Sequence, residues 1–138
     1  MGPFSQFKRK KQSDPSAEKV SLTVLCATAR EGLSAEAAFA LRDIISASSP
    51  LDSEFLNPGS FTVYFNGAAG GKAQAEELAH ALRQYANANA ISSFGVAARV
   101  GECIAAFDAK GRLASPPLGL AINEAMSAAI KEASANAL

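Results

Sequence analysis

The chain has 138 residues, a length that predicts one domain rather than two, and its 49% hydrophobic and 19% charged residues are a globular balance. Its formal net charge at pH 7 is zero, but Lys8, Arg9, Lys10 and Lys11 supply four of the thirteen basic residues. The remainder holds nine basic and thirteen acidic residues, an excess of four acidic groups. Because a nucleic-acid-binding surface needs a basic face, this balance argues against nucleic acid as a partner.

The first 18 residues combine glycine, proline, serine and charge without periodicity, so we expect a disordered basic tail at 1–18 and one folded domain at 19–138. Two phenylalanines, Phe4 and Phe7, lie beside the basic residues 8–11. Aromatic side chains next to clustered cations also suit an anionic membrane surface, which leaves weak peripheral membrane contact open.

The rest of the sequence predicts a cytoplasmic protein without disulfides. No apolar stretch is long enough to span a bilayer, and none resembles a secretory signal. Cys26 and Cys103 lie in apolar runs, where a free cysteine packs as a small buried hydrophobe.

The first half of the domain predicts a strand, a helix and a hairpin. The aliphatic run from Val20 to Ala27 indicates a buried strand. Ser34 is a candidate N-cap for a helix that Pro50 ends. The turn Asn57-Pro58-Gly59, followed by Phe61 to Phe65, indicates a hairpin.

The second half predicts a helix, two strands and a last helix. Apolar residues from Ala75 to Tyr85 recur at helical spacing, Phe94 to Val100 and Glu102 to Phe107 indicate two strand segments, and the last helix starts near Gly119. This order is typical of an α+β, ferredoxin-like (split βαβ) sheet with helices packed on one face. The alanine-rich composition further predicts closely packed helices.

Three patterns suggest chemistry but lack the context for it. The segment Gly67 to Lys72 follows a strand and opens a helix, yet its spacing does not match a phosphate-binding loop. His80 is the only histidine and is expected on a helix surface. Asp108 and Glu102 could form a carboxylate pair, although residues in such positions usually face solvent.

Four segments in the right order resemble the catalytic domain of a class III nucleotidyl cyclase. They are Leu22 to Arg30, Phe61 to Phe65, Gly101-Glu102, and Gly119 with Ile122-Asn123-Glu124-Ala125. The resemblance spans roughly residues 20 to 130 and implies a cyclase-type sheet.

The same resemblance implies that the catalytic groups are missing. The family's two metal-binding aspartates correspond to Thr28 and Gly59, and its triphosphate-binding arginine corresponds to Ser127. Since magnesium sites are built from carboxylates and substrate phosphates, we expect no metal, no cofactor and no cyclase activity.

Three functions remain open. Class III catalytic domains work as head-to-tail dimers, so the resemblance implies a noncatalytic domain that forms a homodimer or pairs with a cyclase homologue to regulate signalling. The helix with Phe39 and Arg42, and the strands near 57–61 or 94–100, are the expected interface. A nucleotide or second-messenger sensor is the alternative, with a cleft formed by Arg30, Gly32, Asn57, Asn123 and Ser127. An enzyme of unrelated mechanism is the third possibility.

Overall fold

The computed structural model describes residues 16–57 and 59–136. The predicted tail, with Phe4, Phe7 and the basic residues 8–11, lies almost wholly outside the described residues, as does Pro58. The disordered-tail and membrane-contact predictions therefore stay predictions.

A four-stranded antiparallel sheet forms the centre of the molecule. Its strands are β1 (Glu18–Ala29), β2 (Asp52–Asn57), β3 (Ser60–Asn66) and β4 (Phe94–Ala105), in the spatial order β2-β3-β1-β4. β1 is the inner strand that pairs with both β3 and β4, which matches its unbroken run of buried residues. The predicted α+β, ferredoxin-like class is confirmed.

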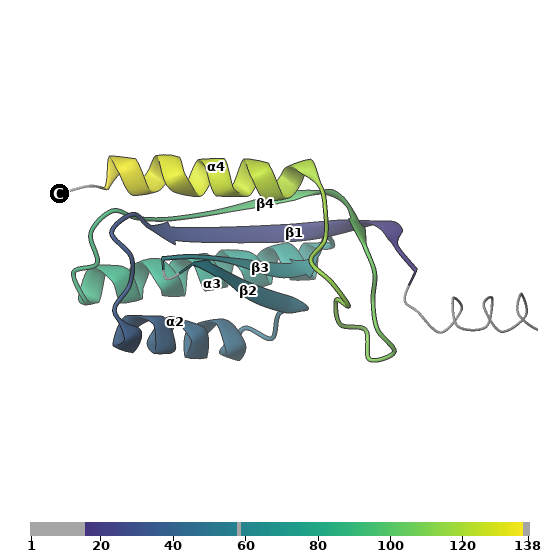
Figure 1. The fold of residues 1–138 in the computed structure, drawn as a ribbon, viewed down its shortest axis with the longest axis horizontal. Helices are drawn as coiled ribbons and strands as arrows, with labels where there is room; N and C mark the ends of the chain where they lie inside the picture. The colour runs from purple at the N-terminus through teal and green to yellow at the C-terminus, as the bar shows by residue number, and fades with distance from the viewer. Residues whose placement is uncertain (1–15, 58, 137–138) are drawn as a thin grey trace, which may run out of the picture.

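In the described part of the chain, three helices flank this sheet: α2 (Ala35–Ala47), α3 (Ala69–Ala88) and α4 (Leu120–Ala135) (Figure 1). The Oγ of Ser34 accepts the backbone N–H of Ala37 at 3.1 Å, so the predicted N-cap of α2 is confirmed. Among the described residues, no helix is long and apolar enough to cross a membrane.

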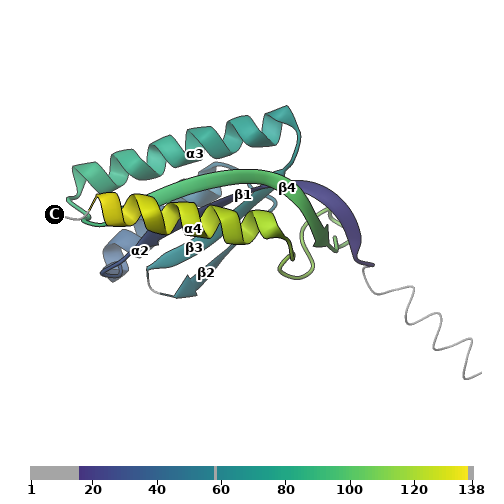
Figure 2. The ribbon, with the colours of Figure 1, turned by 90° about the horizontal axis from the view of Figure 1, so that it is seen from above.

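The helices lie on both faces of the sheet, which corrects one detail of the prediction. Leu25 and Ala27 of β1 pack in the cluster that contains the buried residues of α2 and α3, whereas Leu22 and Val24 pack in the cluster that contains those of α4. Because side chains alternate along a strand, these two sets point to opposite faces. α2 and α3 share one face as expected, and α4 runs over the other face alongside β4 (Figure 2).

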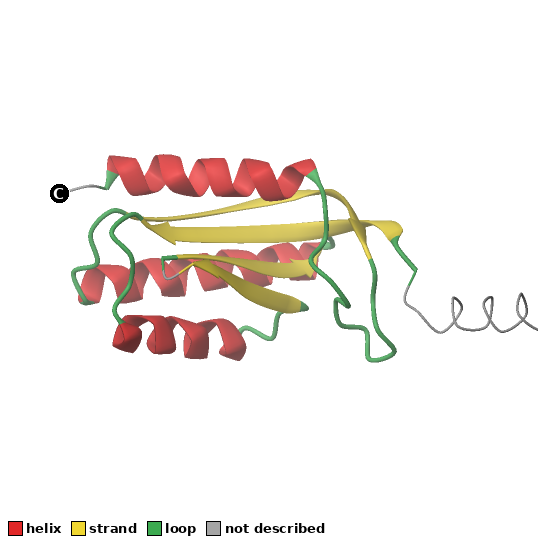
Figure 3. Cartoon of the chain, viewed as in Figure 1, coloured by secondary structure: helices red, strands yellow, loops and turns green. Residues whose placement is uncertain are grey.

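The predicted pair of strands after α3 is a single strand, so the break expected near Gly101 is wrong. β4 runs without interruption from Phe94 to Ala105 and pairs with β1 over its whole length. Gly101 instead lies under α4, where an added Cβ would come within 2.9 Å of the Cβ of Ala121. The glycine marks a close approach of a helix rather than a turn. A long connection, residues 106–119, follows the strand (Figure 3).

A side-chain clamp closes the outer edge of β4 at Val96. Glu132 of α4 accepts the N–H of Val96 at 3.0 Å, and Arg83 of α3 donates to the carbonyl of Val96 at 2.7 Å. Arg83 and Glu132 also bond to each other at 2.9 and 3.0 Å. The clamp thereby joins helices on opposite faces and satisfies two backbone groups that an edge strand would leave unpaired.

We expect Glu132→Gln to lower the free energy of unfolding by about 1 kcal/mol at neutral pH, because a neutral side chain weakens charge-assisted bonds at a half-exposed position. Burial alone would raise the pKa of Glu132, but the bonds from Arg83 and the Val96 N–H lower it overall. A carboxyl group whose pKa is lowered in the folded state stabilises that state at pH values above its pKa in the unfolded chain. This stabilisation is lost as the pH falls through the folded-state pKa. In urea unfolding, the difference in the free energy of unfolding between the wild type and Glu132→Gln should therefore be smaller at acidic than at neutral pH. Glu124→Gln, at an exposed position of the same helix, is the matched control.

Candidate functional site

The two positions that the family resemblance matches to metal-binding aspartates meet at one end of the sheet. Thr28, near the end of β1, lies opposite Ser60, the first residue of β3, in the β1–β3 register. Its Oγ1 lies 2.8 Å from the Oγ of Ser60, and Thr28 is only 6% exposed. The Thr28 hydroxyl therefore has its hydrogen-bond partner within the sheet.

Gly59 precedes Ser60 and is buried against the end of β1. Its carbonyl accepts the N–H of Ala29 at 2.7 Å, and its own N–H is donated to Oδ1 of Asn57 at 2.8 Å. An added Cβ would lie 2.6 Å from the carbonyl oxygen of Ala29 and 3.0 Å from the Cα of Gly32, both main-chain atoms. A side chain at this position would therefore require the main chain of the neighbouring turn to shift.

The tight turn that follows β1 brings three of the predicted cleft residues to the same end. The N–H of Gly32 is donated to the carbonyl of Ala29 at 2.9 Å, and the φ of Gly32 is +80°, a conformation that favours glycine. Arg30 in this turn and Asn57 at the end of β2 are both exposed. Arg30, Gly32 and Asn57 thus flank the Thr28–Gly59 pair.

The other two predicted cleft residues lie on α4. Asn123 and Ser127 are exposed and one helical turn apart, whereas the buried side of the helix is formed by alanines. α4 covers the sheet face toward which Thr28 points, because Thr28 is two residues from Cys26 on β1 and shares its face, and Cys26 is a member of the α4-side cluster. No hydrogen bond joins Asn123 or Ser127 to the turn among residues 16–57 and 59–136, so the cleft stays a prediction.

The other potentially reactive groups of the described chain form neither a metal site nor an activated thiol. Over residues 16–57 and 59–136, no three His, Cys, Asp or Glu residues form a group that could hold a metal ion. Cys26 and Cys103 are buried free thiols, as predicted. Burial raises the pKa of Cys26 to about 11, despite its bond with Thr62, so this thiol stays protonated at neutral pH.

The structure shows where the other candidate residues from the sequence lie. His80 is exposed on α3, as expected. Oδ1 of Asp108 accepts the N–H groups of Lys110 and Arg112 within its own turn, so this carboxylate stabilises a loop. Gly67 and Gly71, in the loop-like segment before α3, lie close against Ser21 and Asn66.

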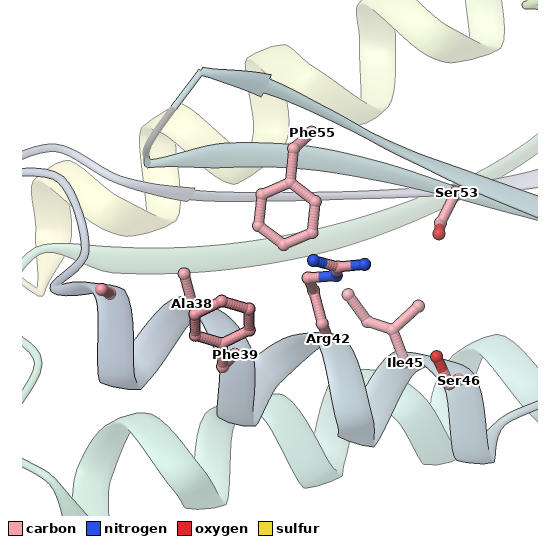
Figure 4. A pocket seen from close by; sticks show the side chains of 8 residues that line it. Ala38, Phe39, Arg42, Ile45, Ser46, Ser53 and Phe55 are labelled. Atoms are coloured by element: carbon pink, nitrogen blue, oxygen red, sulfur yellow. The ribbon is translucent and has the colours of Figure 1, made fainter.

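A groove that the sequence did not reveal lies between α2 and the edge strand β2. Its volume is about 520 Å³, and Phe39, Arg42 and Phe55 line it (Figure 4). Phe39 and Arg42 were expected on an interface helix, but the helical period alone could not place Phe55 across from them.

Comparison with known proteins identifies the fold. No known protein family matches the sequence, and no curated protein sequence matches it. The structure is similar to the adenylyl cyclase CyaB from P. aeruginosa, with a TM-score of 0.53 and 18% identity over 82% of this chain and 74% of that one. It is also similar to a guanylyl cyclase, with a TM-score of 0.51 and 17% identity over 81% and 70% of the two chains.

A bacterial light-regulated adenylyl cyclase gives a TM-score of 0.54 at 11% identity, over 93% of this chain and 49% of that one. At these identities the likeness establishes the fold alone. The chain therefore has the fold of a cyclase domain, as its sequence predicted.

Proposed function

We propose that this chain is a noncatalytic cyclase-like domain that acts by pairing with a second copy of itself or with a related cyclase-type domain. The observation that carries the proposal is the Thr28–Gly59 end of the sheet. One position holds a hydroxyl bonded to Ser60, and the other is a glycine at which a side chain would require main-chain atoms to shift. Neither can supply the carboxylate oxygens that a catalytic magnesium ion requires.

An exposed apolar patch supports the pairing role. Ile104 and Leu118 lie opposite each other in an antiparallel bridge, joined by backbone bonds of 2.7 and 2.9 Å. Val100 lies on the same face of β4, because it is an even number of residues from Ile104, and the exposed Glu102 lies between them on that face. Leu118 and Leu120 are 70% and 76% exposed, and Val100 and Ile104 are exposed as well. We call these four residues the β4–α4 patch.

The patch replaces part of the interface expected from the sequence. Phe61 and Phe94 are buried in the core, so the strands near 57–61 and 94–100 do not offer these aromatic side chains to a partner. Among the described residues of those segments, Val100 is the large apolar residue that is exposed. Apolar surface at the centre of a contact is typical of lasting interfaces, which bury more than about 1,000 Å².

The proposed pairing predicts that light scattering at micromolar concentrations gives twice the chain mass of 14.2 kDa. Leu118→Glu should weaken the dimer by roughly tenfold or more, since it places a charge in the apolar contact. Ile130→Glu is the matched control, because Ile130 is an exposed apolar residue on α4 outside the patch.

A strictly monomeric protein that also fails to bind a cyclase-type domain would contradict the proposal. In that case the alternative, a nucleotide or second-messenger sensor, becomes the leading function. Its candidate contacts remain Arg30, Gly32, Asn57, Asn123 and Ser127. The first three of these flank one turn, which is the observation in its favour.

A further inference from the structure

The groove between α2 and β2 combines an apolar lining with one cation. Ala38, Phe39 and Ile45 line it from α2, and Phe55 lines it from β2. Arg42 and Phe55 point toward each other across the groove (Figure 4). Arg42 is the single charged side chain among the lining residues, so the groove carries one positive charge.

Two aromatic rings form an exposed wall of this groove. Phe39 is 63% exposed and Phe55 is 37% exposed. The ring of Phe55 stacks on that of buried Phe61 with centroids 5.0 Å apart, which holds it in place. The guanidinium of Arg42 lies 5.9 Å from the centroid of Phe39, so the cation is held beside apolar surface.

The positive charge of Arg42 is not neutralised within the described chain. The ion pair found among residues 16–57 and 59–136 joins Arg83 and Glu132. Glu36 and Asp43 are on the same helix as Arg42 but project roughly 100 to 120° away from it. Asp52 and Glu54 alternate with Ser53 and Phe55 and face the other side of β2. Glu54 accepts instead the hydroxyl of Tyr64 at 3.0 Å.

One wall of the groove is also an open strand edge. β2 pairs with β3 alone, so its other edge has no strand partner among the described residues. The N–H of Ser53 on β2 is donated to the carboxylate of Asp52, an exposed bond to an adjacent residue. An edge with unpaired backbone groups is able to take up an additional strand.

We propose that this groove binds an extended peptide segment of a partner protein, which adds a strand to β2. The peptide places an apolar side chain between Phe39 and Phe55 and a carboxylate on Arg42. The apolar wall, the unneutralised cation and the open edge each supply one part of this recognition. The groove and the β4–α4 patch share no residue, so variants can test the two surfaces separately.

The test is a titration of the ¹⁵N-labelled full chain with the capped peptide acetyl-Thr-Val-Leu-Asp-Val-amide, followed by NMR. We expect saturable shifts of the backbone signals of Ser53 and Phe55 and of the α2 residues Phe39 and Arg42. The peptide with Asn in place of Asp should bind roughly tenfold more weakly, because it loses the charge-assisted bond. An analogue N-methylated at its central residues should also bind more weakly if a strand is added.

Variants assign the contacts. Arg42→Gln should remove the preference for Asp over Asn, and Phe39→Ala should weaken both peptides. Both side chains extend into the groove, so the fold should persist. Arg99→Gln on β4 is the matched control and should bind as the wild type does, as should Leu118→Glu.

Three results would overturn the inference. They are the absence of saturable shifts at millimolar peptide, equal affinity for the Asp and Asn peptides, and groove signals that change with protein concentration in the absence of peptide. The last result would assign the groove to a second copy of the chain. Leu118→Glu alters the proposed pairing surface and leaves the groove unchanged. A failure of the peptide test therefore does not affect the outcome of the pairing test.

Discussion

Replacing Gly95 by alanine should lower the free energy of unfolding by about 3 kcal/mol or more, the upper end of what overpacking costs. Gly95 lies on β4 opposite Thr28, on the face that α4 covers. A Cβ added there would collide with the carbonyl oxygen of Ala129 and the backbone nitrogen of Ala133. Main-chain atoms in the middle of a helix cannot move aside as a side chain can, so α4 must lift from the sheet.

Alanine substitutions at two other glycines provide comparisons for the stability of Gly95→Ala. An added Cβ at Gly101 meets mainly the Cβ of Ala121, so Gly101→Ala should cost less than Gly95→Ala. Gly70, in the first turn of α3, has open space around it, and Gly70→Ala should be neutral or slightly stabilising. Urea unfolding followed by circular dichroism measures all three. Equal stability of the Gly95 and Gly70 variants would show that α4 does not pack closely on β4.

The alanine content predicted closely packed helices in general, but not that α4 packs closely on β4 or on which face of the sheet it lies. The buried side of α4 is a stripe of alanines at every fourth position, Ala121, Ala125, Ala129 and Ala133. Such a stripe says that a helix approaches its neighbour closely, and it fits either face of a sheet equally well. Gly95 and Gly101 are the complementary positions on β4, and only the register of the strand identifies them as such.

The candidate site was predictable where its residues are joined by a hairpin or a turn. The hairpin after Asn57 puts Gly59 beside the end of β1, and the family resemblance predicts Thr28 at the same place. The clamp of Arg83 and Glu132 joins residues 49 positions apart on two helices. Each appears as an ordinary surface charge in the sequence, so long-range packing alone reveals the contact.

The sequence did not predict the groove, for a related reason. Phe39 belongs to a helix and Phe55 to a strand, and each pattern accounts for its own residue without reference to the other. Their proximity depends on how α2 packs against the edge of the sheet. Arg42 was predicted to lie on a binding surface, but its lack of an acidic partner follows from which way Glu54 points.

Introducing carboxylates at both positions, by Thr28→Asp together with Gly59→Asp, should yield no cyclic nucleotide and should cost about 2 to 4 kcal/mol of stability. An added Cβ at Gly59 lies 2.6 Å from the carbonyl oxygen of Ala29, so the turn has to open to admit an aspartate. A carboxylate at the buried Thr28 position loses hydration that the Ser60 hydroxyl replaces only in part. Chromatography of reactions with ATP or GTP and Mn²⁺ measures product, and urea unfolding measures stability.

Single variants separate the two costs. Gly59→Ala adds the Cβ alone and should account for most of the loss at that position, whereas Gly70→Ala adds one in open space. Thr28→Asp should become less destabilising as the pH falls, because a buried carboxylate with a raised pKa is favoured in its protonated form. Cyclic nucleotide made by the wild-type chain, and abolished by a chelator, would refute the noncatalytic function. Product from the double variant alone would show that the two carboxylates suffice for catalysis in this chain, without the arginine that the family resemblance matches to Ser127.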